Sequence, residues 1–171
     1  MKLVSYISIL VFILSSCATQ KRTSSNEGES YQVTALFLDA SKQKLIGNYD
    51  KAIEVLKQAE ILSPKNAAIK YELSQIHTFD SEFEIAISYA EEATELDTEN
   101  KWYLLQLAYL YQTNGMHKEA LSVFQKLHKL EPLNVNYAFS LADSYLYLDD
   151  AKSAIEIIDK VEEQIGVTEE M

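Results

Sequence analysis

A period of 34 residues runs through most of this 171-residue chain. One alignment without gaps brings four alanines to equivalent positions, each 34 residues after the one before: Ala52, Ala86, Ala120 and Ala154. The same register aligns the residues of a turn, which are Gly47, Ser81, Gly115 and Asp149. A fixed period of this length is typical of a solenoid, in which each structural unit buries its apolar face only against the next one.

Within each period, apolar residues recur at the spacing of two α-helices. In the third period one stripe consists of Leu104, Leu107, Ala108, Leu110 and Tyr111, and a second of Ala120, Leu121, Phe124, Leu127 and Leu130. Only 4 Gly and 2 Pro are present, which leaves little turn chemistry for a many-stranded fold. The pattern predicts an all-α protein with eight helices, at about 31–46, 50–62, 66–79, 82–96, 100–113, 117–130, 134–148 and 150–164.

Several further positions share the register. Small residues occur where the first helix must approach its neighbour closely, namely Ala40, Ser74, Ala108 and Ala142. Large apolar residues directly precede three of them, at Leu73, Leu107 and Leu141. Aromatic residues follow the turn at Tyr49 and Phe83. Together these positions resemble the tetratricopeptide repeat over residues 33–166. Asp39, Gln43 and Ala151 depart from the family pattern, all in the two terminal repeats. The resemblance implies a right-handed α-solenoid of antiparallel helical hairpins, with repeats at 31–66, 67–100, 101–134 and 135–171, the last ending in a frayed C-terminus.

The N-terminus has the pattern of a secretory signal. Lys2 supplies a positive start, and the apolar stretch from Leu3 to Leu14 is too short to span a hydrocarbon core of about 30 Å as a helix. The residues Leu14-Ser15-Ser16-Cys17 resemble a bacterial lipobox, which implies a signal peptide at 1–16 and lipidation at Cys17, the single cysteine of the chain. The alternative is that Cys17 is a buried residue of an apolar helix.

The polar residues after Cys17 lack a hydrophobic period, and the segment 17–30 is predicted to be a lipidated cysteine followed by a flexible tether. Ala18 follows the cysteine, where the sorting rule for such lipoproteins would require Asp for retention in the inner membrane. We therefore expect a location in the cell envelope, lipid-anchored at the outer membrane and facing the periplasm. The combination of repeats and anchor is similar in style to the many-repeat lipoproteins of Bacteroidetes-type bacteria.

No pattern for catalysis or cofactor binding is found. The formal net charge of −11 disfavours a nucleic-acid partner. The four glycines are dispersed and make neither a P-loop nor a dinucleotide fingerprint. His77, His117 and His128 lack the i, i+4 pairing of a helical zinc site and are expected to have structural roles. We expect no catalytic residue, no cofactor, no metal and no small-molecule substrate.

The remaining candidate is a partner-binding groove. In the tetratricopeptide family the first helices line a concave side, and the resemblance implies that the inward-facing residues here are Phe37, Tyr71, Gln75, Trp102, Gln106, Tyr109, Gln112, Phe139 and Asp143, together with Ser41, Leu105 and Tyr147. Such an aromatic and amide surface suits an extended or helical peptide of a protein partner. The alternative for Tyr71, Leu105 and Phe139 is packing between repeats. One variety of the family grips a C-terminal carboxylate with Lys and Asn; the matching positions here are Phe37, Ser41, Glu72, Trp102 and Gln106.

The last predicted helix carries apolar residues that need cover, at Ile155, Ile158, Val161 and Ile165. Thr168 followed by two glutamates resembles the N-cap and first turn of a ninth helix. This leaves two expectations: the chain is the front part of a longer repeat protein, or another chain covers its end. The main prediction is a non-catalytic scaffold at the envelope. The alternative is an N-terminal sensor or interaction module of a longer signalling protein or enzyme.

Overall fold

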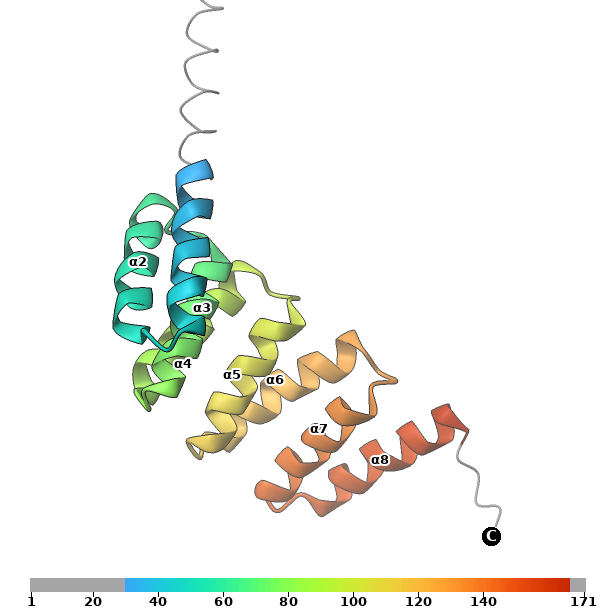
Figure 1. The fold of residues 1–171 in the computed structure, drawn as a ribbon. Helices are drawn as coiled ribbons and strands as arrows, with labels where there is room; N and C mark the ends of the chain where they lie inside the picture. Colours follow the sequence, from blue (N-terminus) through green and yellow to red (C-terminus); the bar gives the residue numbers. More distant parts are fainter. Residues whose placement is uncertain (1–29, 167–171) are drawn as a thin grey trace, which may run out of the picture. The chain divides into compact units, whose positions relative to one another are not determined.

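The computed structural model of the chain describes residues 30–166, and this part contains eight helices and no strand (Figure 1). The first helix spans residues 30–45. The others are α2 (Tyr49–Leu62), α3 (Ala67–Phe79), α4 (Phe83–Leu96), α5 (Lys101–Thr113), α6 (His117–Leu130), α7 (Val135–Tyr147) and α8 (Ala151–Ile165). The predicted all-α class is confirmed, and each helix boundary lies within one residue of its expected place.

Some expectations fall outside the described residues. These are the signal peptide at 1–16, lipidation of Cys17, nearly all of the tether, and the helix start at Thr168. Across residues 30–166 no helix combines the length and the apolar character that a membrane crossing requires.

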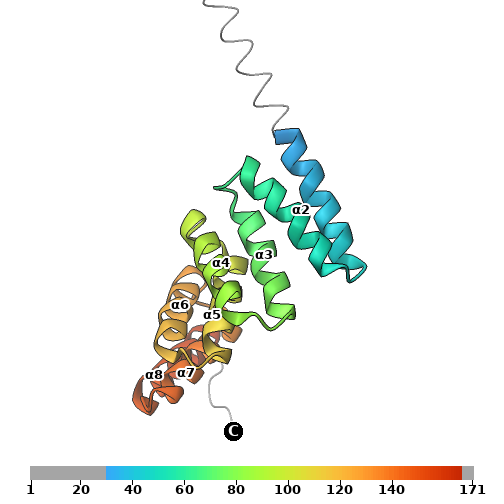
Figure 2. The same cartoon turned by 90° about the vertical axis from the view of Figure 1, so that its left-hand side faces the viewer.

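The chain divides into two units between Pro64 and Lys65. In the first unit the helix over residues 30–45 and α2 run antiparallel and side by side (Figures 1 and 2). Their buried residues are mostly small: Val33, Ala40, Ala52, Val55, Leu56 and Ala59. Because alanine projects only a methyl group, two helices that meet at alanines can approach closely.

The second unit consists of three hairpins, α3/α4, α5/α6 and α7/α8, each packed on the next through α4 with α5 and α6 with α7. The central core is formed by Leu104, Leu107, Leu110, Phe124 and Leu127 of the middle hairpin, with Ala86 of α4 and Tyr137 and Leu141 of α7. Three of the four period-defining alanines lie in this unit, and Ala86, Ala120 and Ala154 are 0%, 1% and 4% exposed. The 34-residue alignment therefore marks sites of close helix contact.

The four turns between paired helices share one backbone conformation. Gly47 and Gly115 have φ of 77° and 74°, and Ser81 and Asp149, at the same position of the other two hairpins, have φ of 61° and 60°. This left-handed region is open to glycine but costs free energy for residues with a Cβ. The turn geometry is thus kept even where the sequence does not supply glycine.

A hydrogen bond repeated along the second unit sets how each hairpin meets the next. The Tyr111 hydroxyl of α5 donates to Glu91 Oε1 of α4 over 2.6 Å. Exactly one period on, Gln125 Nε2 of α6 donates to the Tyr145 hydroxyl of α7 over 3.0 Å. Burial, followed by the bond to Glu91, raises the pKa of Tyr111, so this phenol stays protonated. In the second unit, α4 and α6 therefore each present one polar side chain to a tyrosine of the first helix that follows.

Candidate functional site

Eight of the nine predicted groove residues belong to the second unit, where they lie on α3, α5 and α7. Phe37 lies in the first unit, on the helix over residues 30–45, and is half-buried. The eight residues differ widely in exposure and in their contacts. Seven of them fall into three groups, described below, and Gln112 stands apart.

The starts of these three helices are fixed by asparagines one period apart. The side chains of Asn66, Asn100 and Asn134 accept hydrogen bonds from the backbone N–H groups of Ala68, Trp102 and Asn136, at 3.0, 3.1 and 3.2 Å. Asparagine is a favoured N-cap because its side-chain oxygen satisfies an N–H that the helix leaves unpaired. These caps were not predicted from the sequence, although all three asparagines stand in the same register.

Trp102 and Tyr109 form the first group, named here the aromatic strip. Their side chains are 61% and 55% exposed. They stand seven residues apart on α5, two turns along the same helix face, while Leu104, Leu107, Ala108, Leu110 and Tyr111 bury the opposite face. Lys101 Nζ lies 6.0 Å from the centroid of the Trp102 ring and pairs with Glu131 Oε1 over 2.8 Å, so the cation at the edge of the strip already has an anionic partner.

The second group connects α3 to α5. Gln75 Nε2 donates to the Tyr71 hydroxyl over 2.7 Å, and the Tyr71 and Tyr103 rings are 4.9 Å apart between centroids. Gln106 Nε2 donates to Thr78 Oγ1 over 3.0 Å. Burial raises the pKa of Tyr71 and also that of Tyr103. Tyr71, Gln75 and Gln106 thus have intramolecular partners, which limits what they can offer another protein.

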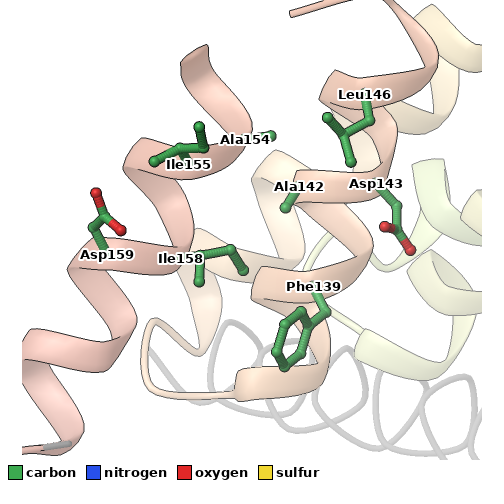
Figure 3. Close-up of a pocket in the computed structure, with 8 residues that line it drawn as sticks. All are labelled: Phe139, Ala142, Asp143, Leu146, Ala154, Ile155, Ile158 and Asp159. Atoms are coloured by element: carbon green, nitrogen blue, oxygen red, sulfur yellow. The ribbon is translucent and has the colours of Figure 1, made fainter. Parts of the chain in front are cut away.

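The third group lies at the last hairpin. Phe139 and Asp143 of α7 line a pocket with α8, named here the terminal pocket, whose other large side chains are Leu146, Ile155, Ile158 and Asp159 (Figure 3). Two alanines complete its floor, and its volume is about 330 Å³. Gln112, in the last turn of α5, is half-buried and does not line this pocket.

Aromatic stacking engages two of the three histidines. His77 Nδ1 lies 2.6 Å from Glu82 Oε2, and the His77 ring stacks on Tyr89. The His117 ring stacks on Tyr147, with centroids 4.5 Å apart and planes 2° apart. Within residues 30–166 no three His, Cys, Asp or Glu side chains gather as metal ligands would. These contacts join neighbouring helices and do not assemble an acid, a base and a nucleophile.

Comparison with known proteins places the fold. The sequence pattern of the family described as anaphase-promoting complex, cyclosome, subunit 3, matches residues 80–161. A crystal structure of MamA is 22% identical with a TM-score of 0.69 and covers 84% of each chain. A second, of MamA protein, is 21% identical with the same score and covers 90% of this chain and 91% of its own. No curated protein matches the chain by sequence.

A further solved structure is the first tetratricopeptide repeat domain of Spaghetti (RPAP3), bound to the HSP90 peptide SRMEEVD. It is 19% identical with a TM-score of 0.62, over 70% of this chain and 98% of that one. At these identities the likeness concerns the fold alone. The chain therefore has a tetratricopeptide-like helical repeat fold.

Proposed function

We propose that this chain is a non-catalytic scaffold that binds a protein or peptide partner through the aromatic strip. The observation that carries the proposal is the exposure of Trp102 and Tyr109, at 61% and 55%, on one face of a helix whose other face is core. Trp and Tyr are enriched among the residues that contribute most to protein interfaces. Large rings with few rotatable bonds give contact area at a low cost in conformational entropy.

The helix that carries the strip is held in place by contacts within the chain. The Asn100 cap fixes the start of α5 next to Trp102, and the buried face of the helix fixes its rotation. A surface that needs no reordering retains more of its contact energy as affinity. Pre-organisation of this kind suits a scaffold, which must present one surface repeatedly.

The net charge of the chain, and the absence of cationic residues at the carboxylate-binding positions, indicate the chemistry of the partner. In the RPAP3 structure a similar fold holds an acidic HSP90 peptide. Here the positions that would grip a C-terminal carboxylate are Phe37, Ser41, Glu72, Trp102 and Gln106, none of them cationic. With a net charge of −11, the chain favours a neutral or basic partner segment over an acidic tail.

The proposal includes a lipid anchor. The lipobox-like residues Leu14-Ser15-Ser16-Cys17 support acylation of Cys17, and Ala18 supports the outer membrane, facing the periplasm, as in lipoproteins of the Bacteroidetes type. One acyl chain holds a protein only marginally, whereas two or three give stable attachment. The tether would then keep the repeats within reach of partners at that surface.

The anchor is tested by Cys17→Ser. The variant should fail to incorporate labelled fatty acid and should leave the membrane fraction, because the chain has no other thiol. Membrane association equal to wild type, together with no label in the wild-type protein, would remove the anchor from the proposal.

The binding surface is tested by Trp102→Ala and Tyr109→Ala, with Tyr31→Ala as the matched control. Tyr31 is also a largely exposed aromatic residue, at 78%, and lies outside the predicted groove. Quantitative affinity capture from solubilised membranes should show that each strip variant weakens partner capture by about 2 kcal/mol or more, with helicity unchanged. A folded Trp102→Ala protein that captures the same proteins with wild-type affinity would contradict the proposal.

A further inference from the structure

The terminal pocket occupies a position that is filled in the preceding hairpin of the same chain. Ile158 and Ile155 of α8 stand one period after Phe124 and Leu121 of α6. Phe124 is only 4% exposed, and Leu121 packs against the same core, to which α7 contributes Tyr137 and Leu141. Ile155, in contrast, is 59% exposed. In the middle hairpin, therefore, the first helix α7 covers the surface that no helix of residues 30–166 covers at the terminal pocket.

The hydrogen bond that joins a second helix to the tyrosine of its covering helix also has a counterpart at the terminal pocket. Glu91 accepts from Tyr111, and Gln125 donates to Tyr145. Asp159 stands one period after Gln125 and lines the terminal pocket with Asp143 (Figure 3). A carboxylate can only accept hydrogen bonds, so a helix seated here needs a donor opposite Asp159. On both covering helices the tyrosine stands three positions after a buried alanine: Tyr111 follows Ala108, and Tyr145 follows Ala142.

A second copy of the chain matches this pocket poorly. The first helix of a copy would bring Asp39 and Gln43 to the positions that Leu107 and Tyr111 occupy in α5. It would thus add a third carboxylate to a pocket that already carries Asp159 on one side and Asp143 on the other (Figure 3). A symmetric contact between two terminal pockets would place four aspartates within one interface, and like charges in an interface repel. Both arrangements also oppose the net charge of −11 on each copy.

We propose that the terminal pocket binds one amphipathic helix of a partner protein. The helix has the apolar and small-residue pattern of this chain's own first helices, carries no acidic residue on the docking face, and has a tyrosine or basic side chain opposite Asp159. This site is additional to the aromatic strip, because neither Trp102 nor Tyr109 lines the pocket.

The probe is a synthetic peptide of residues 100–114, the segment of α5. This peptide contains Leu107, Ala108 and Tyr111 in the required order, one lysine and no acidic residue. It is titrated into the full chain with labelled isoleucine and leucine methyl groups, and binding is followed by NMR. The methyl signals of Ile155 and Ile158 should shift in a saturable way. A peptide with Tyr111→Phe should bind roughly two- to tenfold more weakly, since it lacks the hydroxyl for Asp159.

Ile155→Lys is the diagnostic protein variant. Because Ile155 is 59% exposed, the substitution should leave the fold intact while weakening peptide binding about tenfold or more. Ile61→Lys is the matched control: Ile61 is 80% exposed on α2, and its variant should bind the peptide as wild type does.

Four results would overturn the proposal. The first is the absence of saturable shifts at Ile155 and Ile158 up to about 1 mM peptide, a weak limit for specific binding. The second is equal binding by wild type and Ile155→Lys. The third is a concentration-dependent dimer that Ile155→Lys dissociates, which would make a second copy the occupant. The fourth is a shift of the same methyl signals on deletion of residues 167–171 alone, which would make the chain's own terminus the occupant.

Discussion

The α5/α6 and α7/α8 hairpins are built on the same pattern but differ in what packs against them within residues 30–166. Residues of α6 that match Ile155 and Ile158 pack into a core shared with α7, whereas the terminal pocket is open. Phe124 is 4% exposed, whereas its counterpart Ile158 is half-buried. Leu121 is half-buried against the core, whereas its counterpart Ile155 is 59% exposed. In a repeat fold, the burial of a side chain therefore depends on the neighbouring repeat as much as on the residue itself. Equivalent substitutions in the two hairpins should therefore have unequal effects.

The largest difference is expected between Phe124→Ala and Ile158→Ala. Removing a buried phenylalanine side chain costs about 3–5 kcal/mol, through lost transfer free energy and the cavity left behind. Ile158 is half-buried at an open pocket, so its truncation should cost less than about 2 kcal/mol. Urea denaturation followed by circular dichroism measures both. Equal losses would mean that the terminal pocket is covered in solution.

A smaller difference is expected between Ala120→Leu and Ala154→Leu. Ala120 is 1% exposed inside the core, and extra methylenes there should cost about 1–3 kcal/mol. Ala86→Leu, at the same register position in α4, should behave like Ala120→Leu. Ala154 is also buried, at 4%, but it lines the terminal pocket, which can accept the added atoms, so Ala154→Leu should cost less than about 1 kcal/mol. Thermal melts would test the order, and unchanged midpoints for both Ala86→Leu and Ala120→Leu would contradict the repeat register itself.

The smallest difference is expected at the turns. Gly115 has φ of 74°, and a Cβ there would meet no atom within 4 Å, so Gly115→Ala should cost about 1 kcal/mol from backbone strain alone. Asp149 already carries a side chain at φ of 60°, so Asp149→Ala should cost only a few tenths of a kcal/mol. Denaturation midpoints of the two variants compare these costs. A larger loss for Asp149→Ala would show that its carboxylate, and not the backbone, holds the turn.

The helices were predictable because period and apolar spacing act through backbone geometry. One alignment located all eight helices to within one residue. Asn66, Asn100 and Asn134 stand at one position of the same alignment, but their role as N-caps was not predicted. The spacing of seven residues predicts that Trp102 and Tyr109 share one helix face, and the resemblance to the repeat family indicated which face that is.

Side-chain partnerships were not predictable in the same way. The bonds from Gln75 to Tyr71 and from Gln106 to Thr78 depend on rotamers and on the distance between α3 and α5, which a period does not specify. The place of Phe139 and Asp143 at an open pocket depends on the absence of a covering helix beside α7 and α8 in residues 30–166. Position in the repeat indicated which helix these residues are on, but not what surrounds them.

The packing of each hairpin mainly on its sequence neighbours also has a kinetic consequence. Along α3 to α8 the extensive helix contacts join elements that follow one another in the chain, so each contact closes only a short loop. Closing a short loop costs little entropy, and chains with such local contacts fold in microseconds to milliseconds. Folding can then begin at any hairpin and spread to its neighbours. The α5/α6 hairpin, with a neighbour on each side, is where we expect this growth to start and the last unfolding to occur.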